Sequence, residues 1–592
     1  MASNSTIDVL VIGAGPAGLM CAYNLAQAGI NVRIIDRRPK RLLKGQADVI
    51  QVRGIEILDS IGLASKIIPT AHRTYTYATY KADSSGHISR ASKFDAHFGV
   101  ESRFRFTTNH GQAFIEGVFR DALAAGEQLS KGFSFRSETS QDYTPRKVVV
   151  EQGVRPICLT MREGETEHPV GVEVENLQGE KGIIKAKYVI GCDGAHSWTR
   201  AQLGIDMVGD TSDSVWGLVD VFIDTDFPDL RSVTVVENNG RRAVLVPREN
   251  DMVRFTVQLF GTEVCKDPTT NRIDRAQVPV SKLLQLVKDV FKPYRIDFIG
   301  EPYWDGVYVI GQRLASGYEG AHGRAFIVGD ACHTHSPHAG QGMNAAMSDG
   351  HNLAWKLVHV LRGWTGPDIL RTYELERRTF AEELIRLHEE IGEAMSGKAQ
   401  GTNADLIRGM LGFVCGTNIQ YPPSRIVDPT NQALAKGIPI GQRMPHQVIL
   451  RVADSRPYST HDLLKCDFRY TLLLFTGDIN LPARRKSLES FLEGIGSDRA
   501  VFKIFTILFA KKETCEYTDV PEEARPYWDT VFVDDVAYTA TDGGGTAYSS
   551  LGIGSEGCAV VVRPDGHVAM IAPLSGASDV KGFFGSVKAS GP

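Results

Sequence analysis

Residues 329–344 have the residue types and spacing best suited to binding chemistry. They read Gly-Asp-Ala-Cys-His-Thr-His-Ser-Pro-His-Ala-Gly-Gln-Gly-Met-Asn, and they follow a short apolar run that predicts a buried strand. The apolar spacing of residues 345–361 predicts a helix after them. A glycine-rich loop at a helix N-terminus offers backbone N–H groups to an anion or an electron-rich ring. Asp330 is placed to accept hydrogen bonds from sugar hydroxyls, although the pattern alone also fits an ordinary strand-to-helix connection.

A second candidate binding loop lies near the N-terminus. Residues 7–12 read as a buried strand, followed at once by Gly13-Ala-Gly15-Pro-Ala-Gly18 and a helical pattern. In a dinucleotide-binding unit, Gly13 makes the tight turn, Gly15 lets a pyrophosphate approach, and Gly18 allows close helix packing. The next strand ends on Asp36, where an acid binds ribose hydroxyls. A lone GxGxxG is a weak signal, but here strand, helix, second strand and acid follow in order.

The loop after this unit carries several cations and one notable acid. Arg37, Arg38 and Lys40 are interpreted as a solvated face, which is the usual role of a charge run. Asp48 lies further along, in a more apolar stretch. A carboxylate there is either a helix-start residue or a buried group with a task.

A third pattern combines a turn with a helix start. Asp193-Gly194 follows a predicted strand, and the spacing to Ser197 and Arg200 makes the pattern more specific than Asp-Gly alone. Three histidines were weighed as metal ligands, namely His333, His335 and His338. No fourth ligand is evident, so no metal is predicted.

The elements around these motifs predict an α/β protein with α+β parts. Alternating apolar residues between positions 205 and 315 indicate an antiparallel sheet, interleaved in sequence with the Rossmann-type unit. A long helical stretch covers 367–395, and a looser connection follows residue 401. The last part of the chain alternates strands and helices, which predicts a separate α/β domain.

Composition narrows the class of protein. A length of 592 residues predicts roughly two to four domains, and 42% hydrophobic with 23% charged residues is typical of a soluble globular protein. The net charge of −5 disfavours nucleic acid as a partner. Nine scattered cysteines without a Cys-x-x-Cys pair favour a reducing, cytoplasmic location. Glycines and Asp8 interrupt the apolar N-terminus, so we expect no signal peptide, and no run suggests a membrane span.

Together, the motifs resemble the single-component FAD-dependent aromatic hydroxylases. The three that carry the resemblance are GxGxxG at 13–18, Cys-Asp-Gly-Ala-x-Ser-x-x-Arg at 192–200 and Gly-Asp at 329–330. The phenol 2-monooxygenase branch is the most similar. It also keeps Gly-Gln-Ala-Asp at 45–48, Val-Pro-Arg-Glu-Asn at 246–250 and Gly-Asp-Ala-Cys-His-Thr-His-Ser-Pro at 329–337. The resemblance covers essentially the whole chain.

The resemblance implies one FAD, with NAD(P)H as a transient co-substrate. The flavin ring is expected beside residues 337–344 and above the antiparallel sheet. Arg53 and Gln112 would meet the phosphate and ribityl region, and the Asp193-Gly194 turn is credited in the family with both FAD and NAD(P)H interactions. The implied FAD-binding residues are Gly13, Gly15, Gly18, Asp36, Arg53, Gln112, Asp193, Gly194, Asp330, Gly340, Gly342, Met343 and Asn344.

The implied reaction is hydroxylation of a phenolic substrate by the C4a-hydroperoxyflavin that forms from NAD(P)H-reduced flavin and O₂. Its distal oxygen is electrophilic, so the substrate has to be electron-rich. A phenol, with a pKa of about 10, is a far better nucleophile once deprotonated. Asp48 matches the family position for the base, and Arg248 matches a position where a cation orients the phenolate. The pocket also has to exclude water.

One position departs from the branch. Phenol hydroxylases commonly carry Tyr eight residues after the Arg of Pro-Arg-Glu, where this chain has Thr256. Either Thr256 belongs to a pocket remodelled for a bulkier, polyketide-derived aromatic, or it is only a strand residue. Pro337 is assigned to the same pocket. An alternative activity is Baeyer–Villiger-like or dearomatising oxidation by the same flavin intermediate, and a non-enzymatic flavin-binding protein would have lost the pyrophosphate loop or Asp48.

The domain boundaries follow from these assignments. Residues 1–73, 107–130, 181–205 and 315–400 are expected to form a discontinuous FAD-binding domain, and 74–180 with 206–314 the substrate-binding sheet. Residues 401–436 connect it to a thioredoxin-like domain, 437–592, which in the resembling family lacks redox cysteines and serves contacts between subunits. We therefore expect a homodimer that acts on a small aromatic substrate and O₂, without nucleic acid or membrane partners.

Overall fold

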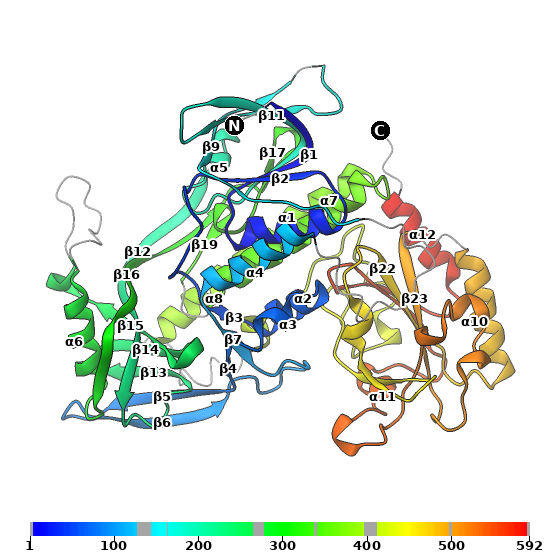
Figure 1. Ribbon diagram of the computed structural model, residues 1–592. Coiled ribbons are helices and arrows are strands. Elements are labelled where there is room, and N and C mark those ends of the chain that lie inside the picture. Colours follow the sequence, from blue (N-terminus) through cyan, green and yellow to red (C-terminus); the bar gives the residue numbers. More distant parts are fainter. Residues whose placement is uncertain are drawn as a thin grey trace.

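The computed structural model describes residues 4–126, 144–162, 164–264, 278–336, 340–395, 411–496 and 500–588. Figure 1 shows three bodies: a central sheet with its helices, a second sheet on the left, and the C-terminal part on the right. Within the described residues, no helix is both long and apolar enough to cross a membrane.

The central sheet contains the N-terminal strand. Its order is β17-β18-β11-β1-β2-β8, with β10 and β9 continuing from β11. The strands are β1 (Ser5–Ile12), β2 (Val32–Asp36), β8 (Glu151–Gln152), β9 (Val154–Met161), β10 (Val170–Asn176), β11 (Lys181–Gly191), β17 (Glu319–Gly320) and β18 (Ala325–Ile327). β1 pairs in parallel with β2 and β11, so its apolar run is buried on both faces.

Helices cover this sheet and carry the predicted binding loops. They are α1 (Pro16–Gln27), α2 (Val52–Ser60), α3 (Ala64–Ile67), α4 (Gln112–Ala125), α5 (Trp198–Gln202), α7 (Gly342–Leu361) and α8 (Arg371–Met395). α1 packs against both α4 and α7. A small sheet beside α2 has the order β3-β7-β4, formed by β3 (Val49–Ile50), β7 (Thr107–Asn109) and β4 (His72–Thr74).

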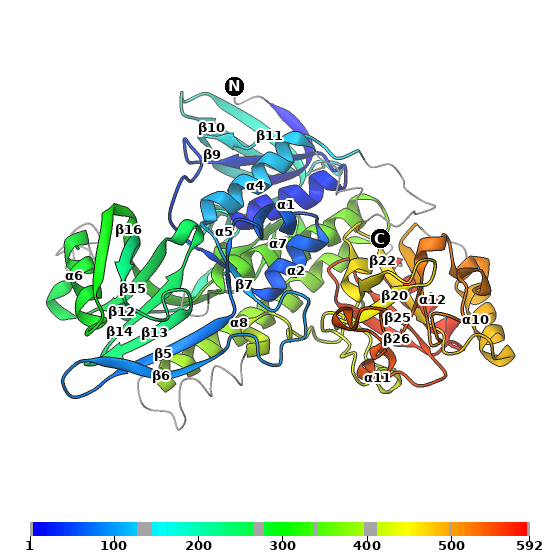
Figure 2. The ribbon, with the colours of Figure 1, turned by 60° about the horizontal axis from the view of Figure 1, so that its bottom comes forward.

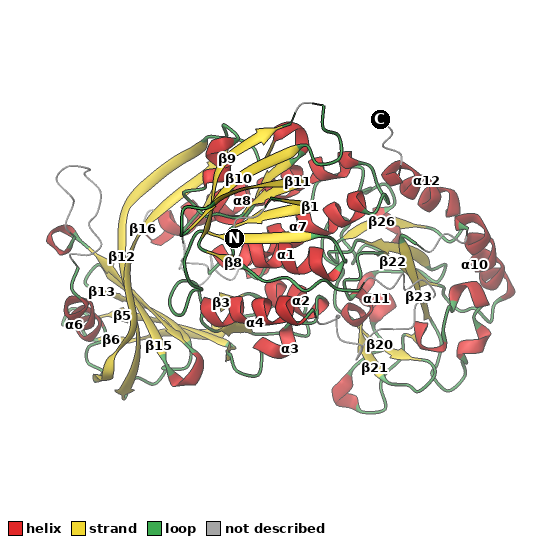
Figure 3. Cartoon of the chain, turned by 45° about the horizontal axis from the view of Figure 1, so that its top comes forward, coloured by secondary structure: helices red, strands yellow, loops and turns green. Residues whose placement is uncertain are grey.

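The second sheet is mostly antiparallel, in the order β19-β16-β12-β15-β14-β13-β5-β6. Its strands are β5 (Thr76–Ala82), β6 (Ile88–Asp95), β12 (Met207–Thr225), β13 (Val233–Asn238), β14 (Arg241–Pro247), β15 (Val253–Leu259), β16 (Ile296–Ala315) and β19 (His333–Thr334). Helix α6 (Val280–Val290) covers one face with a closed apolar core. Figure 3 shows the long strands β12 and β16 rising from this sheet toward the central one. This pair of hydrogen-bonded strands therefore connects the two sheets.

The C-terminal part is built on a third sheet, in the order β21-β20-β24-β23-β22-β25-β26. Its strands are β20 (Val448–Arg451), β21 (Pro457–Ser459), β22 (Tyr470–Phe475), β23 (Phe502–Leu508), β24 (Val531–Val533), β25 (Cys558–Val562) and β26 (Val568–Ala572). Its helices are α10 (Pro482–Ile495), α11 (Ala547–Leu551) and α12 (Ala577–Lys588). Figure 2 shows α10 and α12 side by side at the outer edge of this part. Its thioredoxin-like description stays a prediction.

The mixed α/β class and the strand–loop–helix segments are confirmed. The predicted helix at 345–361 is α7, and the helical stretch at 367–395 contains α8. One boundary is wrong: residues 74–180 were assigned to the substrate-binding sheet, but β8, β9 and β10 belong to the central sheet. β10 pairs antiparallel with β11, so these strands extend the Rossmann-type unit instead of the neighbouring sheet.

Candidate functional site

The turn after β1 has the shape that a pyrophosphate needs. Gly13 has φ +102°, and a Cβ there would lie 2.3 Å from the carbonyl oxygen of Cys192, so only glycine fits. A Cβ on Gly18 would lie 1.9 Å from the Gly13 carbonyl oxygen, which explains the close packing of α1 on the turn. A Cβ on Gly15, in contrast, would meet no described atom within 4 Å. The space in front of Gly15, at the N-terminus of α1, therefore fits a phosphate group.

Asp36 ends β2 beside this turn, and Arg38 binds it. Oδ2 of Asp36 accepts a hydrogen bond from the backbone N–H of Ala14 at 2.9 Å, and Arg38 donates to both carboxylate oxygens at 2.9 and 3.0 Å. Burial raises the pKa of Asp36, but these hydrogen bonds outweigh it and hold the pKa below its usual value. The interpretation of Arg38 as a merely solvated cation is therefore wrong, because a buried carboxylate requires a partner.

Gln112, the first residue of α4, holds the loop that leads to Asp48. Its Oε1 accepts from the backbone N–H of Ala47 at 3.2 Å, and its Nε2 donates to Glu116 at 2.9 Å. Burial raises the pKa of Glu116. Gln112 thus fixes the backbone next to Asp48, and its expected contact with the ribityl region stays a prediction.

The Asp193-Gly194 turn follows β11 and leads into α5, which contacts the Gly-Asp loop through Arg200. Asp193 accepts from the backbone N–H of Thr199 at 2.9 Å, so its carboxylate caps α5. Arg200 donates to the carbonyl oxygen of Ala331 at 3.0 Å. Gly194 has φ +83°, and a Cβ there would meet no described atom within 4 Å. The Asp193 side chain is occupied, and the open side of this turn is the backbone of Gly194.

Side chains of α7 and α8 hold the Gly-Asp loop in place. Asp349 accepts from the backbone N–H of Gly329 at 3.2 Å, lies 2.8 Å from Nε2 of His333, and receives a hydrogen bond from Arg377 at 2.6 Å. Asp330 is exposed to solvent. The protein around it partly desolvates its carboxyl group and so raises the pKa of that group. An exposed carboxylate beside this loop is compatible with the sugar-binding role predicted for it, which stays a prediction.

The start of α7 is tied to the strand that follows Asp48. Asn344 accepts from the backbone N–H of Gln51 at 2.8 Å and donates to the carbonyl oxygen of Val49 at 3.0 Å. Pro337 lies outside the described residues. The other predicted cofactor residues of this loop surround Asn344: Gly340, Gly342 and Met343.

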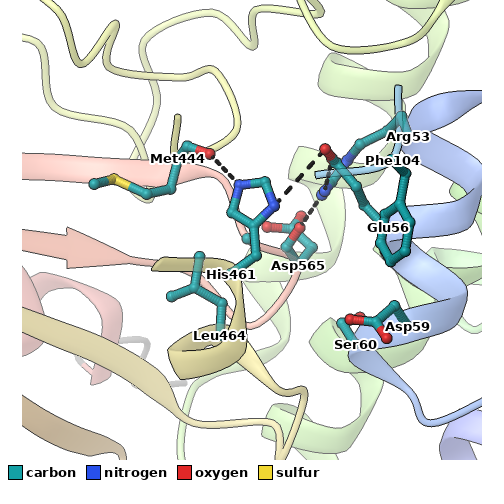
Figure 4. A pocket seen from close by; sticks show the side chains of 10 residues that line it. Arg53, Glu56, Asp59, Ser60, Phe104, Met444, His461, Leu464 and Asp565 are labelled. Atoms are coloured by element: carbon teal, nitrogen blue, oxygen red, sulfur yellow. Dashed lines mark hydrogen bonds and ion pairs between the residues drawn. The ribbon is translucent and has the colours of Figure 1, made fainter. Parts of the chain in front are cut away.

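Arg53 lies elsewhere, at the interface with the C-terminal part. Figure 4 shows its guanidinium beside Glu56, at 3.1 Å, and it donates to the carbonyl oxygen of Asp565. The small cavity here has a volume of about 20 Å³, room for one water. Burial raises the pKa of Glu56, but Arg443, His461 and Arg53 lower it to about 2. The role expected of Arg53 in binding FAD stays a prediction, and its guanidinium pairs here with the buried carboxylate of Glu56.

The face of the second sheet opposite α6 has a central row of aliphatic or small residues with aromatic residues on both sides of it. Val253, Phe255 and Val257 of β15 are buried against α6, so the alternate residues face the other way. The middle row on this open face is made of aliphatic or small residues from adjacent strands: Gly306, Leu218, Thr256, Val244, Val235 and Thr79. Aromatic residues frame it two positions away along the strands: Trp304 and Tyr77 on one side, Tyr308 and Trp216 on the other. Burial raises the pKa of Tyr77 and of Tyr308.

Asp48 lies at the edge of this face, against two arginines. Its Oδ2 is 3.2 Å from Arg254 and 3.6 Å from Arg248. Oδ2 is buried and receives no hydrogen bond within the described part of the chain. The structure thus brings together Asp48 and Arg248, as predicted, with Thr256 two residues along β15 from Arg254. A buried carboxylate oxygen without a donor, next to two cations, is suited to accept the proton of a phenol.

Sequence reasoning missed Arg254 and Asp220. Both are charged residues inside otherwise apolar strands, between Val253 and Phe255 and between Val219 and Val221. That pattern was the available signal. It was not decisive, because a charge at an alternate strand position usually faces water.

Comparisons with known proteins agree with this geometry. The family described as FAD binding domain matches residues 6–388, and the family described as phenol hydroxylase, C-terminal dimerisation domain, matches residues 419–590. Phenol 2-monooxygenase fsqG from Aspergillus fumigatus is 32% identical over 99% of this chain and 97% of its own length. The 3-hydroxybenzoate 4-monooxygenase of Comamonas testosteroni is 30% identical over 98% of this chain and 95% of its own.

A solved structure shares the fold. Aklavinone-11 hydroxylase, in a ternary complex with FAD and aklavinone, superposes with a TM-score of 0.70 at 21% identity, covering 100% of both chains. The glycine turn, Asp36 at the end of β2 and the exposed Asp330 fit an FAD. The family binds this cofactor, with NAD(P)H as the usual co-substrate. The chain therefore belongs to the FAD-dependent aromatic hydroxylases, with a phenol hydroxylase C-terminal dimerisation domain after its FAD-binding domain.

Proposed function

We propose that this flavoprotein hydroxylates a phenolic aromatic bound on the open face of the second sheet, with Asp48 as the proton acceptor. The observation that carries the proposal is the buried Oδ2 of Asp48, which no described donor reaches and which lies within 3.6 Å of two arginines. The chemistry that FAD supplies in this family is reduction by NAD(P)H and activation of O₂. The residues of the chain prepare the aromatic ring for attack.

The proton transfer follows from charges at the site. A phenol whose O–H donates to Asp48 passes its proton to that carboxylate as negative charge develops on the ring. Arg254 and Arg248 lie beside the same oxygen, and a nearby cation favours the ionised phenol. The ring gains electron density at its ortho and para carbons. The aliphatic middle row keeps water away from it.

The middle row also favours a substrate larger than phenol. Thr256 sits at its centre, between Leu218 and Val244, where branch members commonly carry Tyr. With no aromatic ring in this row, we expect room for a larger ring system between the framing pairs of aromatic residues. A fused-ring phenol would fill it. This supports the first of the two expectations for Thr256, a remodelled pocket.

Asp48→Asn tests the proposal. The holoenzyme is assayed with phenol, 2-naphthol and 2-anthrol, and NAD(P)H oxidation, hydroxylated product and H₂O₂ are measured. We expect product formation to fall about 100-fold or more, because general-base catalysis contributes about 10²–10⁴-fold. Asp224→Asn, an exposed acid on the same strand as Asp220, is the matched control and should retain activity. Unchanged product formation by Asp48→Asn would refute the base assignment.

The same panel tests the pocket. Thr256→Tyr is expected to favour phenol over the larger rings and to release more H₂O₂ with 2-anthrol. If wild type and Thr256→Tyr rank the three phenols alike, Thr256 is only a strand residue. Structural analysis of the product separates hydroxylation from the Baeyer–Villiger-like alternative, which yields an ester.

We also propose that the chain forms a homodimer, because residues 419–590 match a dimerisation domain. Light scattering of the purified holoenzyme measures its mass, and a monomer at micromolar concentration would contradict this proposal. The cytoplasmic location stays a prediction.

A further inference from the structure

We propose that Asp220 is a positioning residue whose charge sets how strongly a phenol bound beside Asp48 ionises. The inference rests on the proposed function of Asp48. It concerns a residue that never touches the substrate, because Asp220 is fully buried on β12 behind the two arginines.

Asp220 holds both cations that face Asp48. Its Oδ1 accepts from Nε of Arg254 at 2.7 Å, and its Oδ2 accepts from Arg254 at 2.9 Å and from Arg248 at 3.0 Å. Arg254 is therefore held in a bidentate pair, which fixes the plane of its guanidinium. Its remaining terminal nitrogen donates to the carbonyl oxygen of Gln46, two residues before Asp48, at 2.7 Å. Asp220 thus holds one side of this guanidinium, and the Nη1 that donates to Gln46 is also the atom that lies 3.2 Å from Oδ2 of Asp48.

The charges around Asp48 come from four elements. β15 contributes Arg254, Arg248 follows the end of β14 directly, β12 carries Asp220, and Tyr308 of β16 stands on the same face. Glu249 binds Arg248 through both oxygens at 2.9 Å, and its Oε1 also accepts from the backbone N–H of Gly111 at 3.2 Å. His110 lies behind Glu249, at 3.6 Å.

This arrangement balances the arginines before Asp48 is counted. Asp220 and Glu249 supply two negative charges to the two guanidinium groups, which stay protonated at any working pH. The charge of Asp48 is then not needed to neutralise them. Asp48 remains available to take a proton from the phenol, while the arginines still orient the phenolate. Without Asp220, one full positive charge would act on Asp48 and on the phenol.

Asp220→Asn removes that charge while keeping the shape of the side chain. An opposite charge within about 4–6 Å typically lowers an acid's pKa by 1–3 units. We therefore expect bound phenols to ionise at a pH about one unit or more lower in Asp220→Asn than in wild type. A residue that acted only by packing would not move this value.

The reporter is 4-nitrophenol bound to oxidised holoenzyme without NAD(P)H, so that no turnover occurs. Difference absorbance of the nitrophenolate against pH gives the pKa of the bound ligand. Asp229→Asn is the matched control, because Asp229, in the turn between β12 and β13, is also buried and ion-paired, but with Arg90 and Lys93. We expect no shift in that variant. An unshifted reporter in Asp220→Asn would overturn the proposal.

A second pair of variants keeps the test decisive if Asp220→Asn folds poorly. Arg254→Gln should raise the pKa of bound 4-nitrophenol by about one unit or more, because it removes a cation. Asp220→Asn with Arg254→Gln should return it near the wild-type value. Equal reporter values in Arg254→Gln and wild type would also refute the role of Asp220. The two hypotheses can be refuted separately. Unchanged product formation by Asp48→Asn refutes the base assignment, whereas an unchanged pKa of bound 4-nitrophenol in Asp220→Asn refutes the positioning role of Asp220.

Discussion

Gly15→Ala should weaken FAD binding without unfolding the protein. The added Cβ meets no described atom within 4 Å, so the protein itself has room for it. That same space is where a pyrophosphate has to approach the N–H groups at the start of α1. The variant therefore separates a cofactor effect from a folding effect, which most glycine substitutions in this turn cannot do.

The size of the effect follows from the hydrogen bonds at risk. A hydrogen bond to a charged group contributes about 1.5–3 kcal/mol. Each 1.4 kcal/mol or so changes an equilibrium constant tenfold. Loss of one N–H contact to phosphate should therefore raise the Kd for FAD by about 10- to 150-fold.

Titration of apoprotein with FAD, followed by flavin fluorescence, measures this Kd, and circular dichroism measures thermal stability. Gly117→Ala in α4, where a Cβ also meets no described atom within 4 Å, is the control that should leave this Kd unchanged and raise thermal stability slightly, because alanine is favoured over glycine inside a helix. Gly13→Ala should lose stability even without FAD, because of its φ of +102° and the Cys192 oxygen at 2.3 Å. FAD binding by Gly15→Ala within twofold of wild type would refute the placement of the pyrophosphate.

Three further predictions concern the interface with the C-terminal part. Arg53→Met should leave the Kd for FAD within about twofold of wild type but lower the calorimetric melting temperature, because it strips a cation from buried Glu56. Glu376→Gln should cost about 3–5 kcal/mol in urea unfolding, because both of its cationic partners are buried, whereas the exposed Asp224→Asn should cost about 1 kcal/mol or less. Acid should destabilise the fold in two steps, seen in melts from pH 7 to 2. The pKa of His461 is lowered from 6.5 to about 4, so the stability that its neutral form contributes is lost as pH falls from 6.5 through 4. The pKa values of Glu56 and Glu376 are lowered from 4.5 to about 2, so the stability that their ionised forms contribute is lost as pH falls from 4.5 through 2.

The sequence predicted those parts of the site that are contiguous in the chain. The turn at Gly13 and the loop before Asn344 each combine a strand, a turn and a helix start, and these signals are local. The contact of Arg53 with the C-terminal part was not predicted, because its partner Asp565 lies far away in sequence. Asp220 was missed for the same reason, since its meaning comes from pairing β12 with β15. Long-range pairing decides which charges are buried, and a single sequence does not display it.

The C-terminal part is bound to the cofactor loop by buried charges. Arg563, at the end of β25, binds Glu376 of α8, and both side chains are completely buried. The next residue of α8, Arg377, holds Asp349, which in turn fixes the backbone N–H of Gly329. Removing the C-terminal part would take Arg563 away from Glu376 and leave it with Lys356, and loss of one partner from a buried ion-pair network destabilises the helix that carries it. The Gly-Asp loop therefore depends on a domain whose family description mentions only dimerisation.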